Sequence, residues 1–218
     1  MLVGERTNRT CVLHAVMYLR GVKQALIDPS INSEFTRRLY EKITEFYLEL
    51  NKRCFEEADG LIDIFMIGED LGTQEGLLVS PKIFREFIKP YLAKHVQLAK
   101  RYGVKVMLHS CGAIHELIPD LIEMGIGILN PIQVRAKGMN PIELKREYGD
   151  KLSFHGGIDI QQTLPYGAPK DVRAEVRERI QTLGRGGYIL CTTHNIQPDT
   201  PLINILAMYE EAKKQSLR

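Results

Sequence analysis

Two residue types that bind soft metal ions, histidine and cysteine, stand one residue apart in the segment Val104–Gly112. The apolar run Val104–Leu108 predicts a short buried strand, and His109 and Cys111 leave its end. In an extended chain residues i and i+2 project to the same side, so one ion can meet both side chains. Imidazole and thiolate suit Zn²⁺. A structural cysteine beside a hydrogen-bonded histidine explains the pattern equally well.

A catalytic zinc ion takes three protein ligands and keeps one position open. His109 and Cys111 would supply two of the three ligands. The third must come from elsewhere in the chain, and Cys191 and His194 follow the last predicted strand, which begins near residue 188.

Acidic residues follow another apolar run, Leu61–Gly68, which predicts a buried parallel strand. Glu69 and Asp70 come directly after it and are candidates for catalysis, as a fourth metal ligand or a general base. A structural role, capping the loop and the helix that begins near Ser80, explains them as well.

Two further predicted strands end in polar residues. Asn130 and Gln133 follow the strand that begins near residue 127, and we assign them to cofactor binding. His155 and Asp159 flank a Gly-Gly pair after the strand that begins near residue 152, and we assign them to catalysis. The backbone N–H groups of that turn can hold an anion, but a tight turn alone also accounts for the glycines.

The elements that must position these residues alternate along the chain. Predicted strands begin near residues 61, 104, 127, 152 and 188, and a helix follows each. Such alternation indicates an α/β fold with parallel strands, either a (β/α)8 TIM barrel or a doubly wound sheet. The polar residues at strand C-terminal ends favour the barrel, and no G-x-G-x-x-G motif supports a dinucleotide fold.

The strand count is short of a full barrel. Five clear strands and a doubtful one near residue 2 are fewer than eight, and a complete barrel has about 250 residues. We therefore expect one domain over residues 1–218 that lacks the first one or two βα units.

Helix boundaries follow from breakers and caps. Residues 11–26 have helical spacing, and Asp28-Pro29-Ser30 is expected to end that helix. A long helix should run from Asn32 or Ser33 to about Ala58. Its expected buried stripe is Phe35, Leu39, Ile43, Phe46, Tyr47 and Leu50.

Prolines and histidines also occur inside the predicted helices. Pro90 should kink or split the helix that Ser80-Pro81 opens, and Pro119 should bend the next helix. Of the histidines in helical stretches, His14, His95 and His115, we expect surface or hydrogen-bonded roles.

Composition limits the class of protein. The 218 residues are 44% hydrophobic and 26% charged, as in an ordinary globular domain. A net charge of +2 argues against nucleic acid or an acidic membrane as the partner. The chain has no bilayer-length apolar run and no signal-peptide pattern at its start, so we expect a cytoplasmic protein. In that compartment disulfides are rare, and we expect Cys11 and Cys54 to be small buried side chains.

Six motifs, taken together in order, resemble the uroporphyrinogen decarboxylase superfamily, and most closely its cobalamin-dependent methyltransferase branch. The motifs are DLGTQ at 70–74, SPxxF at 80–84, LHSCG at 108–112, NPIQ at 130–133, GGID at 156–159 and HNIQPDTP at 194–201. The resemblance covers nearly the whole chain and implies a (β/α)8 barrel.

In the methyltransferase branch, an H-x-C pair and a later cysteine hold zinc, which activates a thiol to accept methyl from a methylated corrinoid. The resemblance places the pair at His109 and Cys111. Counted back from Pro-x-Thr-Pro, the position of the later cysteine is His194 here, with Cys191 as a substitute. The implied partners are a corrinoid protein and a small-molecule acceptor.

Two alternatives stand beside this hypothesis. The decarboxylase branch resembles the chain at His194 and acts on a tetrapyrrole without metal, but its arginine-rich motif has no counterpart here. The chain can also be a non-catalytic subunit that completes its barrel with another chain, or a homo-oligomer, because an exposed barrel edge is a liability for a monomer.

Overall fold

The computed structural model describes residues 2–3 and 12–216. The chain packs as two compact units, Met1–Ile128 and Leu129–Arg218, and each is described by itself. Cys11 lies outside the described residues.

The described residues of the first unit include three parallel strands, β1 (Leu2–Val3), β2 (Ile64–Gly68) and β3 (Lys105–His109), with β2 paired to both of the others. Gly68 is opposite His109 in the β2–β3 register, so the residues after β2 and β3 leave the sheet side by side. The helical segments of this unit are α1 (Leu13–Arg20), α2 (Val22–Ile31), α3 (Ser33–Ala58), α4 (Pro81–Ile83), a π-helical turn (Phe84–Ile88), α5 (Lys89–Arg101), a 3₁₀ turn (His115–Leu117) and α6 (Ile118–Met124).

In the second unit β5 (Ser153–Ile158) and β6 (Tyr188–Thr192) are parallel neighbours. The other elements are β4 (Ile128–Ile132), which begins at the boundary, and α7 (Pro141–Tyr148), α8 (Thr163–Tyr166), α9 (Pro169–Leu183) and α10 (Leu202–Ser216). The predicted alternation of strands and helices is confirmed, with strand starts within three residues of those expected.

Each unit buries its own apolar side chains. In the first unit, the β3 side chains Val106, Met107 and Leu108 are almost inaccessible to solvent, as their apolar character predicts, whereas Lys105 at the start of β3 is exposed. In the second unit, α9 and α10 pack together over the end of β5. The shared core there consists of Ile158, Leu164, Val172, Val176, Ala207 and Met208.

The expected helix break at Asp28-Pro29 is wrong. The chain breaks at Gly21, which has a φ of 77°, and α2 then continues through Pro29 to Ile31. Asp28 is buried in α2 and accepts hydrogen bonds from the side chains of Arg20, Gln24 and Asn32. Led by the hydrogen bond from Arg20, these contacts lower the pKa of Asp28 to about 2. The carboxylate therefore joins the last residue of α1 to the C-terminal end of α2, which local propensity does not show.

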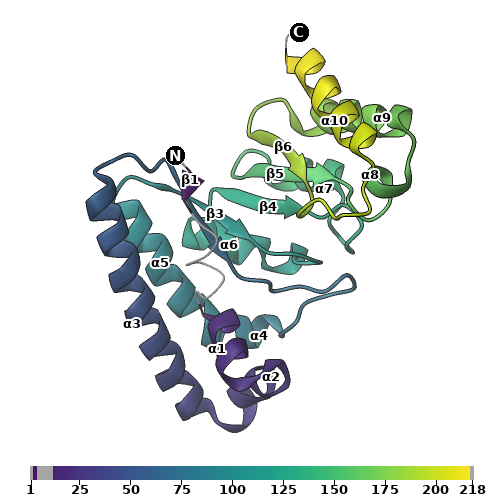
Figure 1. The fold of residues 1–218 in the computed structure, drawn as a ribbon. Helices are drawn as coiled ribbons and strands as arrows, with labels where there is room; N and C mark the ends of the chain where they lie inside the picture. Colours follow the sequence, from purple (N-terminus) through teal and green to yellow (C-terminus); the bar gives the residue numbers. More distant parts are fainter. Residues whose placement is uncertain (1, 4–11, 217–218) are drawn as a thin grey trace. The chain divides into compact units, whose positions relative to one another are not determined.

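Helix α3 has the predicted bounds, but of the predicted buried stripe only Ile43 is buried. Phe35 and Phe46 are 47% and 63% exposed, and Cys54, expected to be buried, is exposed as well. The buried residues of α3 are Thr36, Tyr40, Ile43, Thr44, Asn51 and Phe55. Half of them are polar, so apolar periodicity locates the buried face of this helix only in part. Figure 1 shows α5 beside α3, and contacts between the two helices agree.

The two prolines act differently. The helix that starts at Pro81, with Ser80 Oγ accepting from Ile83 N at 3.3 Å, widens to a π turn before Pro90, so the expected interruption is confirmed. Pro119 instead lies in the first turn of α6, directly after the 3₁₀ turn, so it stands at the start of that helix rather than inside it. A proline is tolerated there because its missing N–H would have no helical partner anyway.

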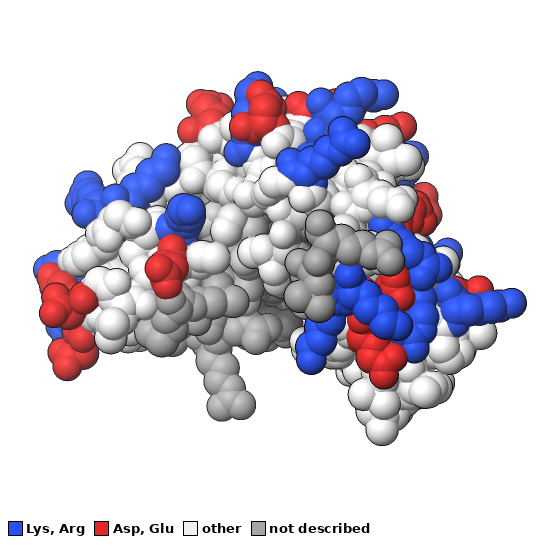
Figure 2. Space-filling model, turned by 90° about the horizontal axis from the view of Figure 1, so that it is seen from above, with Lys and Arg blue, Asp and Glu red and all other residues white. Residues whose placement is uncertain are grey.

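None of the described helices is long and apolar enough to cross a lipid bilayer. On the face drawn in Figure 2, Lys and Arg side chains alternate with Asp and Glu. That view shows no large field of one sign, in keeping with a net charge of +2.

His95 in α5 is fully buried, and its Nδ1 lies 3.5 Å from the Asn51 side-chain nitrogen. Burial is the main cause that lowers the pKa of His95 from 6.5 to about 4. The neutral imidazole is thus part of the folded core, and the expected hydrogen bonding is met at Nδ1 only, because Nε2 is buried without a hydrogen-bond partner among the described residues.

Acid should therefore destabilise the first unit through His95. The pKa of His95 is lower in the folded protein than its ordinary value of 6.5. The neutral imidazole therefore contributes fully to the free energy of unfolding above pH 6.5, and this contribution is lost as pH falls toward about 4. Between pH 7 and pH 5 we expect wild type to lose about 2 kcal/mol more unfolding free energy than His95→Gln. Urea unfolding of both proteins at each pH measures the difference, and equal losses would contradict it.

Candidate functional site

The end of β3 brings the predicted metal ligands together in the first unit. His109 is the last strand residue, and its Nε2 lies 3.6 Å from the Sγ of Cys111. Two ligands of one tetrahedral zinc ion, with Zn–N near 2.0 Å and Zn–S near 2.3 Å, lie about 3.6 Å apart. The pair therefore fits zinc in donor type and in separation, and the same distance also fits a direct S–H···N contact.

Two loops pack tightly beside this pair. The backbone of Leu71 donates to the buried Ser110 hydroxyl at 3.0 Å, and Ala113 N donates to Thr73 O at 2.7 Å. Gly112 has a φ of 85°, and a Cβ there would lie 2.5 Å from Thr73 O. Only glycine fits this close backbone approach.

Asp70 faces the pair from the neighbouring strand end. Its Oδ1 accepts from Cys111 N at 2.8 Å and lies 3.8 Å from His109 Nε2. The side chain is 36% exposed, so it borders solvent and the candidate ligands at once.

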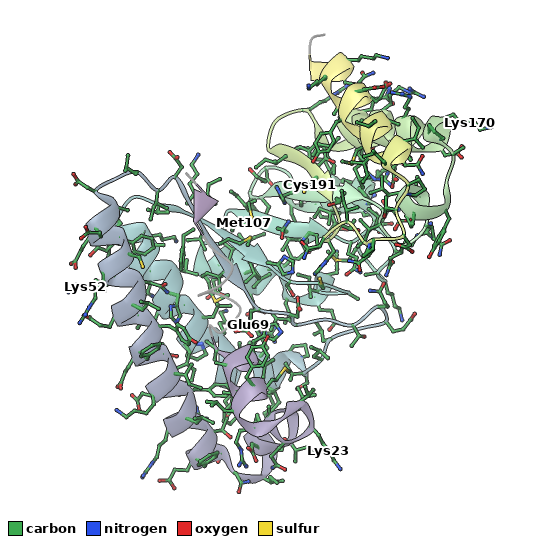
Figure 3. The ribbon with its side chains drawn as sticks, in the orientation of Figure 1. Lys23, Lys52, Glu69, Met107, Lys170 and Cys191 are labelled. Atoms are coloured by element: carbon green, nitrogen blue, oxygen red, sulfur yellow. The ribbon has the colours of Figure 1, made fainter. Side chains whose placement is uncertain are left out.

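Glu69, in contrast, is fully buried, and its carboxylate accepts hydrogen bonds from the start of helix α1 (Figure 3). It accepts from the backbone nitrogens of Val12 at 2.9 Å, Leu13 at 3.1 Å and His14 at 3.0 Å. Burial raises the pKa of Glu69, while His14 and the three N–H groups oppose that shift. The predicted capping of the helix near Ser80 is therefore wrong for this residue: Glu69 caps the start of α1, and Ser80 Oγ caps the other helix.

Sequence reasoning missed His14 as a site residue. Its Nδ1 lies 3.7 Å from Glu69 Oε1, and its Nε2 lies 3.7 Å from Asp70 Oδ2. It therefore meets both acidic candidates. No motif signals this, because the contact depends on where α1 packs.

In the second unit, the candidates after β4 and β5 meet other polar groups. The Asn130 side-chain nitrogen is hydrogen-bonded to His155 Nδ1. Asp159 is buried, and its two oxygens accept from Arg135 Nε and from Gln161 N. Cofactor binding by Asn130 and catalysis by His155 and Asp159 stay predictions, as does the assignment of Gln133.

The glycines between His155 and Asp159 have a packing role. Gly156 and Gly157 have φ values of 115° and 93°, and their carbonyls accept from Tyr188 Oη at 2.8 Å and Arg179 Nε at 3.0 Å. Those contacts use carbonyl oxygens, whereas anion binding would use the N–H groups. Both glycines lie inside β5, opposite Leu190 and Cys191 of β6, so the tight turn predicted at this pair is wrong.

Both candidates for the third ligand belong to the second unit. Cys191 lies on β6, opposite Gly157, and is partly buried (Figure 3). His194 lies two residues beyond the strand, where its carbonyl accepts from the Thr192 hydroxyl at 2.6 Å. This hydrogen bond turns the chain directly after β6.

Comparison with known proteins shows which family the chain belongs to. The family model "Uroporphyrinogen decarboxylase (URO-D)" matches residues 12–215. The chain belongs to the URO-D family. The predicted resemblance is thereby confirmed.

The relatives include enzymes of both branches. A methylated-thiol–coenzyme M methyltransferase of Methanosarcina mazei is 30% identical over 198 residues, which are 90% of this chain and 49% of that protein. A uroporphyrinogen decarboxylase of Thermus thermophilus is 26% identical over 178 residues, 79% of this chain and 47% of that protein. The chain thus spans about half the length of these relatives.

The fold also matches a solved structure, described as a methyltransferase from Methanosarcina mazei. The TM-score is 0.72 at 21% sequence identity, over 94% of this chain and 57% of that one. The predicted fold class, α/β of the TIM-barrel type, is confirmed.

The tight packing at Gly112 gives a test of the site's architecture. We expect Gly112→Ala to destabilise the first unit by more than about 2 kcal/mol, because the new Cβ clashes with backbone and the φ is unfavourable. Gly60→Ala is the matched control, since its φ is 79° but nothing lies within 4 Å of the added Cβ. Urea unfolding measures both, and equal effects would show that the loop approach is not required.

Proposed function

We propose that this chain is the zinc-binding part of a methyltransferase that moves a methyl group from a methylated corrinoid to a thiol or similar acceptor. The observation that carries the proposal is the 3.6 Å separation of His109 Nε2 and Cys111 Sγ. The similarity to a methylated-thiol–coenzyme M methyltransferase supports the same branch of the family.

His109 and Cys111 would hold the ion, with His194 as the third ligand and Cys191 as its substitute. Bound zinc would lower the pKa of an acceptor thiol and so provide a nucleophile at neutral pH. Asp70 would fix the loop that carries Cys111 through its hydrogen bond to the Cys111 amide. Glu69 would hold α1 in place.

In the transfer itself, the acceptor sulfur would form a bond to the methyl carbon while the cobalt–carbon bond breaks. The electron pair of that bond stays with the corrinoid, and the thiol proton passes to solvent. The corrinoid would arrive on a partner protein, with Asn130 and Gln133 as the proposed contacts. His155 and Asp159 keep their proposed catalytic assignment.

Zinc binding tests the proposal directly. We expect close to one equivalent of zinc in purified protein, and an affinity at least about 100-fold weaker in Cys111→Ser. His194→Ala should weaken binding similarly, while Cys191→Ser should not. Cys54→Ser, at an exposed cysteine of α3, is the matched control. Metal analysis and competition with a chromophoric chelator measure these changes.

Two outcomes would overturn or revise the zinc site. Less than about a tenth of an equivalent of zinc, with no change in Cys111→Ser, contradicts it. If Cys191→Ser rather than His194→Ala weakens binding, the third ligand is Cys191.

Tetrapyrrole decarboxylation is the second candidate, because uroporphyrinogen decarboxylases are among the relatives. It predicts metal-free protein that binds a porphyrinogen. Binding of uroporphyrinogen, followed by fluorescence after oxidation, would favour this function. Methyl transfer from methylcobalamin to a thiol would favour the first.

A further inference from the structure

We propose that His14, in the first turn of α1, is a positioning residue that holds Asp70 against the Cys111 amide. The effect of His14 on metal binding rests on the proposed function. The placement of Asp70 by His14 rests on the geometry of the first unit alone.

The His14 imidazole lies between two carboxylates. Its Nδ1 is 3.7 Å from Glu69 Oε1, and its Nε2 is 3.7 Å from Asp70 Oδ2. The side chain is only 19% exposed, so the ring is largely packed against its neighbours. His14 is the described side chain that links the buried carboxylate to the one at the site.

The backbone of His14 is fixed by the same carboxylate that its ring contacts. Glu69 Oε1 accepts from His14 N at 3.0 Å, and Glu69 N donates to His109 O at 2.8 Å. The backbone that carries the ring is therefore connected, through Glu69, to the strand that carries His109. A side chain held in this way can orient its neighbour at little entropic cost.

Asp70 presents one oxygen to each side. Oδ1 accepts from Cys111 N, and Oδ2 faces His14. A partly exposed aspartate has several accessible rotamers, and the contact with His14 favours the one that reaches Cys111. Without the imidazole, we expect the Cys111 N–H to lose its acceptor for much of the time.

Amide hydrogen exchange in metal-free protein tests this placement. In His14→Leu we expect the Cys111 amide to exchange about tenfold faster, and Asp70→Asn should act in the same direction. His14→Gln places an amide N–H donor near Oδ2 and should restore most of the protection. Leu19→Ala, on the same helix and 68% exposed, is the matched control.

The pattern of exchange separates positioning from mere stability. If His14→Leu only loosens α1, exchange should rise across α1 and α2, and His14→Gln should not restore protection at Cys111. That result would overturn the proposal, as would unchanged exchange at Cys111.

A second readout uses the metal. Cobalt(II) added in place of zinc should give a thiolate charge-transfer band, and we expect His14→Leu to weaken cobalt binding by about tenfold. Glutamine at position 14 should keep binding close to wild type. Unchanged affinity in His14→Leu would overturn the role at the metal centre.

The experiments can refute the proposed function and the role of His14 independently of each other. If wild-type protein binds neither zinc nor cobalt, the proposed function falls, while faster Cys111 exchange in His14→Leu still supports the positioning of Asp70. If metal binds with the affinity expected but exchange is unchanged, the zinc site stands and the role of His14 is refuted.

Discussion

The buried carboxylate of Glu69 is the interaction on which the first unit depends. A carboxylate without solvent is costly unless donors replace the lost water. Three backbone N–H groups of Val12, Leu13 and His14 do so, and they belong to the positive end of α1. Since Glu69 directly follows β2, this contact joins the first helix to the strand ends. The position of His14 beside Asp70 is a consequence.

A second constraint is the close approach of two backbones. The segments after β2 and β3 are hydrogen-bonded through Ala113 and Thr73, with Gly72 and Gly112 at the tightest points. Side chains in a segment packed this way have few alternatives. His109 and Cys111 are therefore presented by a rigid support, which a metal site requires if its ligands are to be in place before the ion binds.

The proposed ligand set has one sulfur fewer than the H-x-C plus cysteine pattern of the methyltransferase branch. Replacing a thiolate by a neutral imidazole makes the charge on the site more positive by one unit. A more positive ion lowers the pKa of a bound thiol further. A thiolate of lower pKa is also less nucleophilic. The proposed His194 ligand would thus favour deprotonation of the acceptor at some cost in its reactivity.

Much of this protein was determined by local sequence. Alternating apolar runs and amphipathic segments predicted the order of the elements and most of their bounds, because that periodicity depends only on near neighbours. The H-x-C spacing at a strand end also placed His109 and Cys111 together, since i and i+2 share a side. Tertiary structure alone decided that α1 is capped by Glu69, that His14 faces two carboxylates and that the buried face of α3 is half polar. These features depend on contacts between residues as far as 57 positions apart, such as Val12 and Glu69, and no local pattern encodes which distant group will meet a given side chain.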